Sequence, residues 1–179
     1  MNTFQRRAFG ALYKYSSPSN SRVFLTVASG ETKIGDLVFE LYDDKQAATT
    51  ENFKAMVDGS AANGSSYIGS SFNKGMAGFG IQGGATGEEG YGAFGCFNVD
   101  GDLTLRHHKR GMLTTVSKGQ HQNGSEFTVT FGAANWLDGY QTVFGELVEG
   151  DNVLSQIEAA TDRHGKVNGE FTIVAGGMK

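Results

Sequence analysis

The chain has 179 residues, of which 39% are hydrophobic and 19% are charged, a composition typical of one compact globular domain rather than of a disordered chain. The formal net charge is −4, and residues 1–22 contain four basic and no acidic residues, so the rest of the chain is acidic. An acidic body lacks the clustered lysine and arginine that nucleic-acid binding requires, which excludes nucleic acid as a partner.

Residues 1–22 form a basic N-terminal extension to a predicted domain at residues 23–179. Its apolar residues Phe4, Ala8 and Leu12 follow a helical spacing between basic residues, a pattern that resembles a mitochondrial targeting segment. The alternative is a tail that docks on another chain. We therefore expect a mitochondrial location, with the cytoplasm as the alternative, and contact between this extension and the protein partners of a multi-subunit complex. Residues 16–21 predict a polar linker.

The domain opens with a predicted hairpin of strands at residues 23–28 and 34–42, followed by a helix that Thr49 or Thr50 caps and that ends near Gly59. Residues 59–95 predict a long loop with small strands, a kind of segment where functional sites tend to lie. Alternating apolar residues then predict strands and one more helix. These strands are at 112–116, 127–131, 142–148 and 171–175, and the helix is at 151–159. The pattern predicts a mainly β fold, a closed antiparallel eight-stranded barrel capped by two helices.

The residues offer no site for a metal or a cofactor. Cys96 is the single cysteine, and His107 and His108 are adjacent, a spacing that does not direct two imidazoles at one metal. The glycine-rich stretch at 83–92 has no following Lys–Ser/Thr pair and carries two glutamates, which would repel phosphate. No apolar run approaches the roughly 20 residues of a membrane-spanning helix. We therefore predict no metal, no cofactor and no membrane span.

Four separated motifs resemble the cyclophilin family of peptidyl-prolyl isomerases in matching order and spacing. They are VFELYDDKQAATTENFKAM (38–56), SSFNKGMAGFGIQGGA (70–85), NGSEF (123–127) and NWLDGYQTVFGELVEGDNV (135–153). The resemblance implies the family's barrel fold and a site that isomerises Xaa–Pro bonds. In that site a guanidinium aimed at the proline nitrogen stabilises the lone pair that develops as the amide twists.

The resemblance implies that this site is altered. The chain keeps a pocket aromatic, the glutamine that orients the catalytic arginine, and two rim residues: Phe79, Gln82, Trp136 and Leu137. It departs from the family's histidine, catalytic arginine, pocket methionine, floor phenylalanine and pocket histidine, and the residues at these positions are Asn73, Lys74, Gly80, Thr128 and Gln141. Lysine supplies a flexible point charge in place of a planar fork.

Two functions follow from this mixture. The first is a binding or structural role, as an accessory subunit of a larger mitochondrial assembly with an eroded isomerase site. The second is an active isomerase of Xaa–Pro peptides in which Lys74 replaces the arginine. Cyclic-peptide inhibitors of the family are a poor match, because Gly80 and Thr128 are expected to hollow the pocket that such ligands fill.

Overall fold

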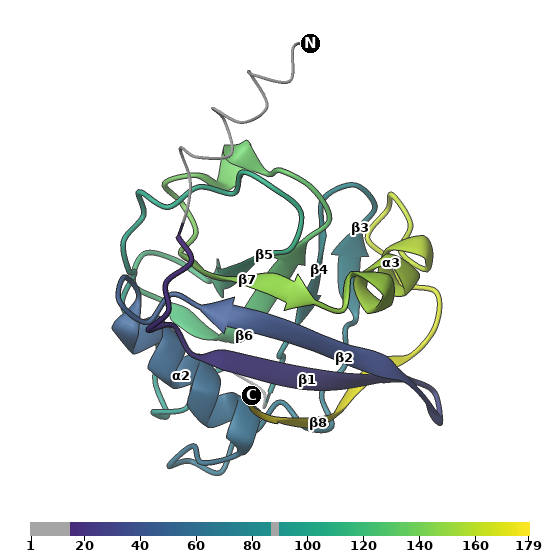
Figure 1. Cartoon of the computed structure of the whole chain (residues 1–179), viewed down its shortest axis with the longest axis horizontal. Helices are drawn as coiled ribbons and strands as arrows, with labels where there is room; N and C mark the ends of the chain where they lie inside the picture. The colour runs from purple at the N-terminus through teal and green to yellow at the C-terminus, as the bar shows by residue number, and fades with distance from the viewer. Residues whose placement is uncertain (1–14, 87–89) are drawn as a thin grey trace.

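The computed structural model describes residues 15–86 and 90–179. These residues form one antiparallel sheet of eight strands that curls into a half-barrel, with two α-helices packed on it (Figure 1). The strands are β1 (Arg22–Ser29), β2 (Thr32–Leu41), β3 (Lys74–Met76), β4 (Gly80–Gly83), β5 (Met112–Ser117), β6 (Asn123–Thr130), β7 (Val143–Glu149) and β8 (Phe171–Met178).

The sheet has two edges. The strand order β3-β4-β6-β5-β7-β2-β1-β8 leaves β3 and β8 at its ends. The predicted closed barrel is therefore wrong, whereas the predicted mainly β, antiparallel fold with two helices is confirmed. Closure would need a continuous ladder between the two edge strands. The segment that precedes β3 instead meets β8 through the isolated bridge Ser71↔Thr172.

The outer side of β3 is covered by the loop at residues 162–166. The N–H of Ala77 donates to the carbonyl of Asp162 at 3.0 Å, and Lys74 pairs with Lys166 in an isolated antiparallel bridge. These contacts leave few free backbone groups at this edge of the sheet. They also fix the position of β3, which is only three residues long.

The two helices pack on different parts of the sheet. Helix α2 (Ala47–Asp58) contacts β1, β6 and β8, and helix α3 (Asp151–Ala159) contacts β2 and β4. Helix α3 begins and ends at the predicted residues, with an aspartate in its first turn, where a negative charge suits the helix dipole. Helix α2 begins earlier than predicted, because its N-cap is Gln46 and not one of the two threonines. Neither helix of the described chain is long and apolar enough to cross a membrane.

Phe53 of α2 lies at the centre of an aromatic cluster in the core. Its ring centroid lies 5.1 Å from that of Tyr67 and 5.2 Å from those of Phe127 and Phe144. These rings are almost completely buried and come from three different parts of the sheet and its loops. The cluster therefore joins α2 to β6, the strand that also carries Thr128.

Residues 15–21, which include the predicted polar linker at 16–21, make hydrogen bonds to the sheet. The buried carboxylate of Glu40 accepts hydrogen bonds from the backbone N–H of Ser17 and the Nδ2 of Asn20, each at 3.0 Å. Burial alone would raise the pKa of Glu40, but hydrogen bonds from this segment lower it below its ordinary value. Most of the extension that was predicted to contact partners, residues 1–14, lies outside the described residues together with the targeting-like pattern.

Truncating the central ring tests the importance of this core. We expect Phe53→Ala to lower the free energy of unfolding by about 3–5 kcal/mol, because it leaves a cavity among the three aromatic rings that surround Phe53. Urea denaturation followed by circular dichroism measures the change. Phe94→Ala is the matched control, because the Phe94 side chain is 52% exposed, and it should change stability by less than about 0.5 kcal/mol. Equal losses in the two variants would contradict the central role of Phe53.

Candidate functional site

Three polar side chains of the predicted site lie in one row across neighbouring strands. Lys74 of β3 is paired directly with Gln82 of β4, and Gln82 is paired with Thr128 of β6. Directly opposite residues of an antiparallel ladder project their side chains from the same face of the sheet. The register therefore brings together an ammonium, a carboxamide and a hydroxyl from three strands, of which β6 is distant in the sequence from the other two.

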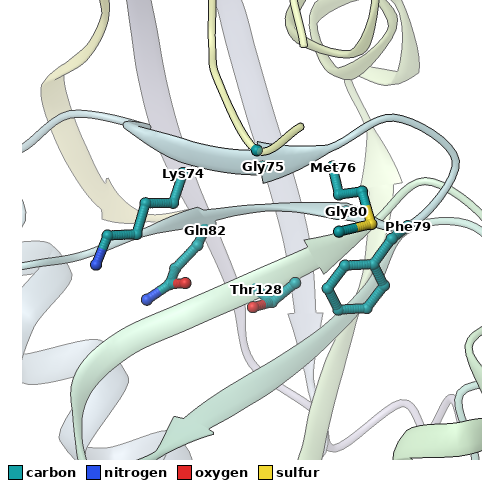
Figure 2. Close-up of a pocket in the computed structure, with 8 residues that line it drawn as sticks. Lys74, Gly75, Met76, Phe79, Gly80, Gln82 and Thr128 are labelled. Carbon is teal, nitrogen blue, oxygen red and sulfur yellow. The ribbon is translucent and has the colours of Figure 1, made fainter. Parts of the chain in front are cut away.

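This row lines a cavity of about 280 Å³ at the β3 edge of the sheet. Figure 2 shows Lys74 and Gln82 at one end of the cavity, Met76 and Phe79 at the other, and Thr128 between them. Most of the lining surface is apolar. The lining residues are Lys74, Gly75, Met76, Phe79, Gly80, Gln82, Thr128 and Gly165. Of the predicted site residues, five are therefore brought together here.

The apolar end of the cavity continues into an aromatic pair. The ring of Phe79 lies 5.8 Å from the ring of Trp136, centroid to centroid, with the two planes tilted by 47°. Trp136 belongs to the 3₁₀ helix η1 (Asn135–Leu137), and its side chain is 61% exposed. An exposed indole beside a pocket is a surface on which a peptide can pack. Leu137 is half-buried in the same turn.

Gly80 does not hollow the pocket as the sequence suggested. A Cβ atom at this position would lie 2.8 Å from the carbonyl oxygen of Val129 and 3.0 Å from the Cγ2 of Thr128. Strand β4 therefore approaches β6 too closely to leave room for a side chain at residue 80. Met76 was not predicted as a site residue, and its sulfur-containing side chain lines the cavity. Its position could have been found, because Met76 is two residues from Lys74 on a strand and so faces the same side.

Two predicted site residues lie elsewhere. Asn73 is exposed beside β3 and does not line the cavity. Gln141 lines a separate cavity of about 480 Å³, together with Asp100 and Tyr140. The Oε1 atom of Gln141 is buried and has no hydrogen-bond partner among the described residues. The geometry thus separates Gln141 from the row that contains Lys74.

A buried polar chain lies behind the pocket. Thr128 is paired across β6 and β5 with Thr114, whose Oγ1 lies 3.0 Å from the Nε2 of His107. The Nδ1 of His107 in turn lies 2.8 Å from the carboxylate of Asp138. This order of hydroxyl, imidazole and carboxylate resembles an acyl-transfer triad, but Thr114 and His107 are completely buried and no substrate can reach them. These three side chains therefore support the site and take no part in chemistry themselves.

Burial and hydrogen bonds set the ionisation states of His107 and Asp138. Burial lowers the pKa of His107 below its ordinary value, although the hydrogen bond to Asp138 acts in the opposite direction. Burial alone would raise the pKa of Asp138, but hydrogen bonds from the backbone N–H and the ring of His107 lower it. At neutral pH the pair therefore consists of a neutral imidazole and a carboxylate, and the Nδ1–H of His107 donates a hydrogen bond to the carboxylate of Asp138.

Comparison with known proteins agrees with the motifs. The chain matches the family described as "Cyclophilin type peptidyl-prolyl cis-trans isomerase/CLD" over residues 23–177. It belongs to this family. The resemblance seen in the sequence is thus confirmed over most of the chain, and the cavity that contains Lys74 and Gln82 lies within the matched residues.

Two cyclophilin relatives differ in what their names say of activity. The chain is 35% identical over 165 residues to "Probable inactive peptidyl-prolyl cis-trans isomerase-like 6" of Bos taurus, covering 87% of this chain and 54% of that protein. It is 33% identical over 159 residues to "Peptidyl-prolyl cis-trans isomerase" of Encephalitozoon cuniculi (strain GB-M1), covering 87% and 91%. The chain thus spans about half the length of the bovine relative and most of the second one.

The lowered pKa of His107 predicts a pH dependence of stability. Because the folded state holds the imidazole neutral, the unfolded chain binds a proton first as the pH falls below about 6.5. The free energy of unfolding should therefore be highest near pH 7.5 and should fall toward pH 5.5, with a contribution from this group of at most about 1.4 kcal/mol per pH unit. Urea denaturation at a series of pH values measures the slope.

Two variants identify the titrating group. His107→Gln should flatten the slope, although it also lowers stability at pH 7.5, because it breaks the hydrogen bonds to Asp138 and Thr114. His164→Gln, which changes an exposed histidine, should leave the slope unchanged. A His107→Gln protein with the original slope would show that another group is responsible.

Proposed function

We propose that this cyclophilin-family chain binds protein segments at the Lys74 cavity and isomerises Xaa–Pro bonds slowly or not at all. One observation carries the proposal. Lys74 lines the same cavity as Thr128, so the two positions at which the sequence departs most from the family's chemistry act on one bound group. The name of the bovine relative, with "Probable inactive", supports the same direction.

The change at Lys74 weakens the stabilisation of the transition state. Rotation about an Xaa–Pro bond has a barrier of roughly 20 kcal/mol, and an aimed donor lowers it by stabilising the nitrogen lone pair. The ammonium of Lys74 is on a flexible stem and is exposed, so its donors have no fixed direction. Loss of one preorganised donor typically lowers the rate by about 10²–10³.

The change at Thr128 weakens the binding of a proline ring. A phenylalanine at this position, as in the family pattern, would present an aromatic face to the ring, whereas Thr128 presents a methyl and a hydroxyl. Its neighbour across the ladder is Gln82, a second polar group. Burial of apolar surface contributes about 25 cal/mol per Å², so a smaller and more polar floor binds proline less well. Both changes therefore favour binding of something other than proline.

We further propose that the chain is an accessory subunit of a mitochondrial assembly. The support for this part is the basic, acid-free and amphipathic pattern of residues 1–14. Residues 15–21 are used within the chain itself, since they bury Glu40. The segment before Tyr15 is therefore the part available for targeting or for contact with a partner.

An active isomerase is the second candidate. Its support is the retained row of Lys74 and Gln82, which keeps a cation and a carboxamide side by side, and the Phe79–Trp136 pair, which keeps an aromatic wall. The Encephalitozoon cuniculi relative carries the isomerase name without qualification. The two candidates differ in whether a bound Xaa–Pro bond turns over.

A protease-coupled assay on an Xaa–Pro peptide separates them. We expect the purified protein to isomerise the peptide at or near the uncatalysed rate, and Lys74→Ala to leave that rate unchanged. Lys45→Ala is the matched control, because Lys45 pairs with a neighbouring aspartate and does not line the cavity. Turnover above background that is lost in Lys74→Ala and kept in Lys45→Ala would establish the isomerase instead.

The location is tested separately. We expect a fluorescent fusion of the full chain to reach mitochondria, and a fusion that lacks residues 1–14 to remain in the cytosol while still folding, because residues 15–21 keep their contacts with the sheet. Size-exclusion chromatography of a mitochondrial extract should place the protein in a complex much larger than 19.1 kDa. A free monomer in the cytosol would contradict both parts of the proposal.

A further inference from the structure

The Lys74 cavity has a basic rim in a chain whose net charge is −4: Lys74 lines the cavity, and Lys166 lies directly opposite Lys74 without lining the cavity itself. Lys74 and Lys166 are paired directly in an antiparallel bridge, so their side chains project from the same face. Like charges placed opposite each other are destabilising. Arg163 lies in the same loop, and within the described ranges none of the three forms an ion pair. This arrangement favours a bound anion that would relieve the repulsion.

The loop that carries this rim is held firmly. The carboxylate oxygen Oδ1 of Asp162 accepts the backbone N–H groups of His164 at 2.7 Å and Lys166 at 3.0 Å. The N–H of Ala77 donates to the carbonyl of Asp162, which ties the loop to β3. The nearest acid in the loop is thus used by the backbone and forms no ion pair with a lysine. The basic side chains therefore stay available to a ligand.

The cavity itself has two chemically different ends. At one end Lys74, Gln82 and Thr128 present donors, and their side chains make no hydrogen bond to any described residue. At the other end Met76 and Phe79 present apolar surface, as Figure 2 shows. A ligand that satisfies both ends carries an anionic oxygen next to an apolar group. Proline itself satisfies only the apolar end.

We propose that the cavity recognises a carboxylate next to an apolar side chain in a protein segment, with the carboxylate at Lys74, Gln82 and Thr128 and the apolar group at Met76 and Phe79. This inference rests on the proposed binding function and names its ligand class. The carboxylate belongs either to an internal acidic residue or to a chain end. Glu126 is on the same face of β6 as Thr128, two residues away, but it is not among the residues that line the cavity.

The single tryptophan of the chain reports on binding. Trp136 contacts Phe79 of the cavity, so its fluorescence should change when a peptide binds. The probes are four acetylated peptides. Three have amidated ends and the sequences Ala-Leu-Glu-Ala, Ala-Leu-Gln-Ala and Ala-Leu-Pro-Ala, and the fourth is Ala-Ala-Leu with a free carboxyl end. We expect the glutamate peptide to bind about three- to tenfold more tightly than the glutamine peptide, because only it carries the charge.

Substitutions and salt test the role of the rim. Lys74→Gln should remove the preference for glutamate over glutamine, and Lys166→Gln should reduce it. Lys45→Gln, which removes an equal charge outside the cavity, should leave the preference unchanged. An increase in ionic strength from 50 to 500 mM should also reduce it, because salt screens charges at an exposed rim. Circular dichroism verifies that each variant is folded.

The outcomes separate this inference from the proposed function. If binding of the glutamate peptide depends on Lys74, the ligand is a side-chain carboxylate. If only binding of the free-ended peptide depends on Lys74, the ligand is the carboxylate of a chain end. Both outcomes support carboxylate recognition. Tighter binding of the proline peptide than of both carboxylate peptides would leave a binding role and overturn the carboxylate specificity. No fluorescence change with any of the four peptides would overturn both.

Discussion

The antiparallel register of β3, β4 and β6 is the constraint on which the site depends. It places Lys74, Gln82 and Thr128 directly opposite one another, so that three strands supply one polar row. A slip of one residue in β3 would turn Lys74 to the other face. Because β3 has only three residues, its register depends on the loop that covers its outer side, where Ala77 bonds to Asp162. The loop that supplies the basic rim therefore also fixes Lys74.

The close approach of β4 to β6 explains why the changes in the pocket belong together. A side chain at Gly80 would collide with the carbonyl of Val129, which is backbone and cannot move aside easily. The family pattern places a methionine at this position, and the short distance between β4 and β6 leaves no room for its side chain. Met76 lines the cavity from the neighbouring strand instead. The pocket is thus rebuilt around a different set of side chains, and its floor is the small, polar Thr128.

The sequence predicted the elements better than their long-range pairing. Helix α3 was placed correctly because Asp151 and the apolar spacing mark it locally. The prediction of a closed barrel was wrong because the number of strands does not determine whether the two edge strands, β3 and β8, pair with each other. In this structure the loop at 162–166 covers the edge of β3. Motif spacing brought five site residues to one cavity. It could not show that Gln141 lines a different cavity or that Gly165 and Lys166 lie beside Lys74, because these depend on tertiary contacts.

The lysine at position 74, which we propose weakens catalysis, would also suit the recognition of an anion. Stabilisation of a twisting amide needs donors fixed in direction, which a guanidinium held by a glutamine provides and the stem of Lys74 does not. A carboxylate makes a weaker demand, because an ammonium is a point charge that can follow its ligand and donate three hydrogen bonds in any direction. Thr128 changes in the same sense, since a hydroxyl donates to a carboxylate but gives a proline ring no face to pack on. Retention of Gln82 is compatible with both roles, so the proposed change of function would be carried by the two ends of the row and not by its centre.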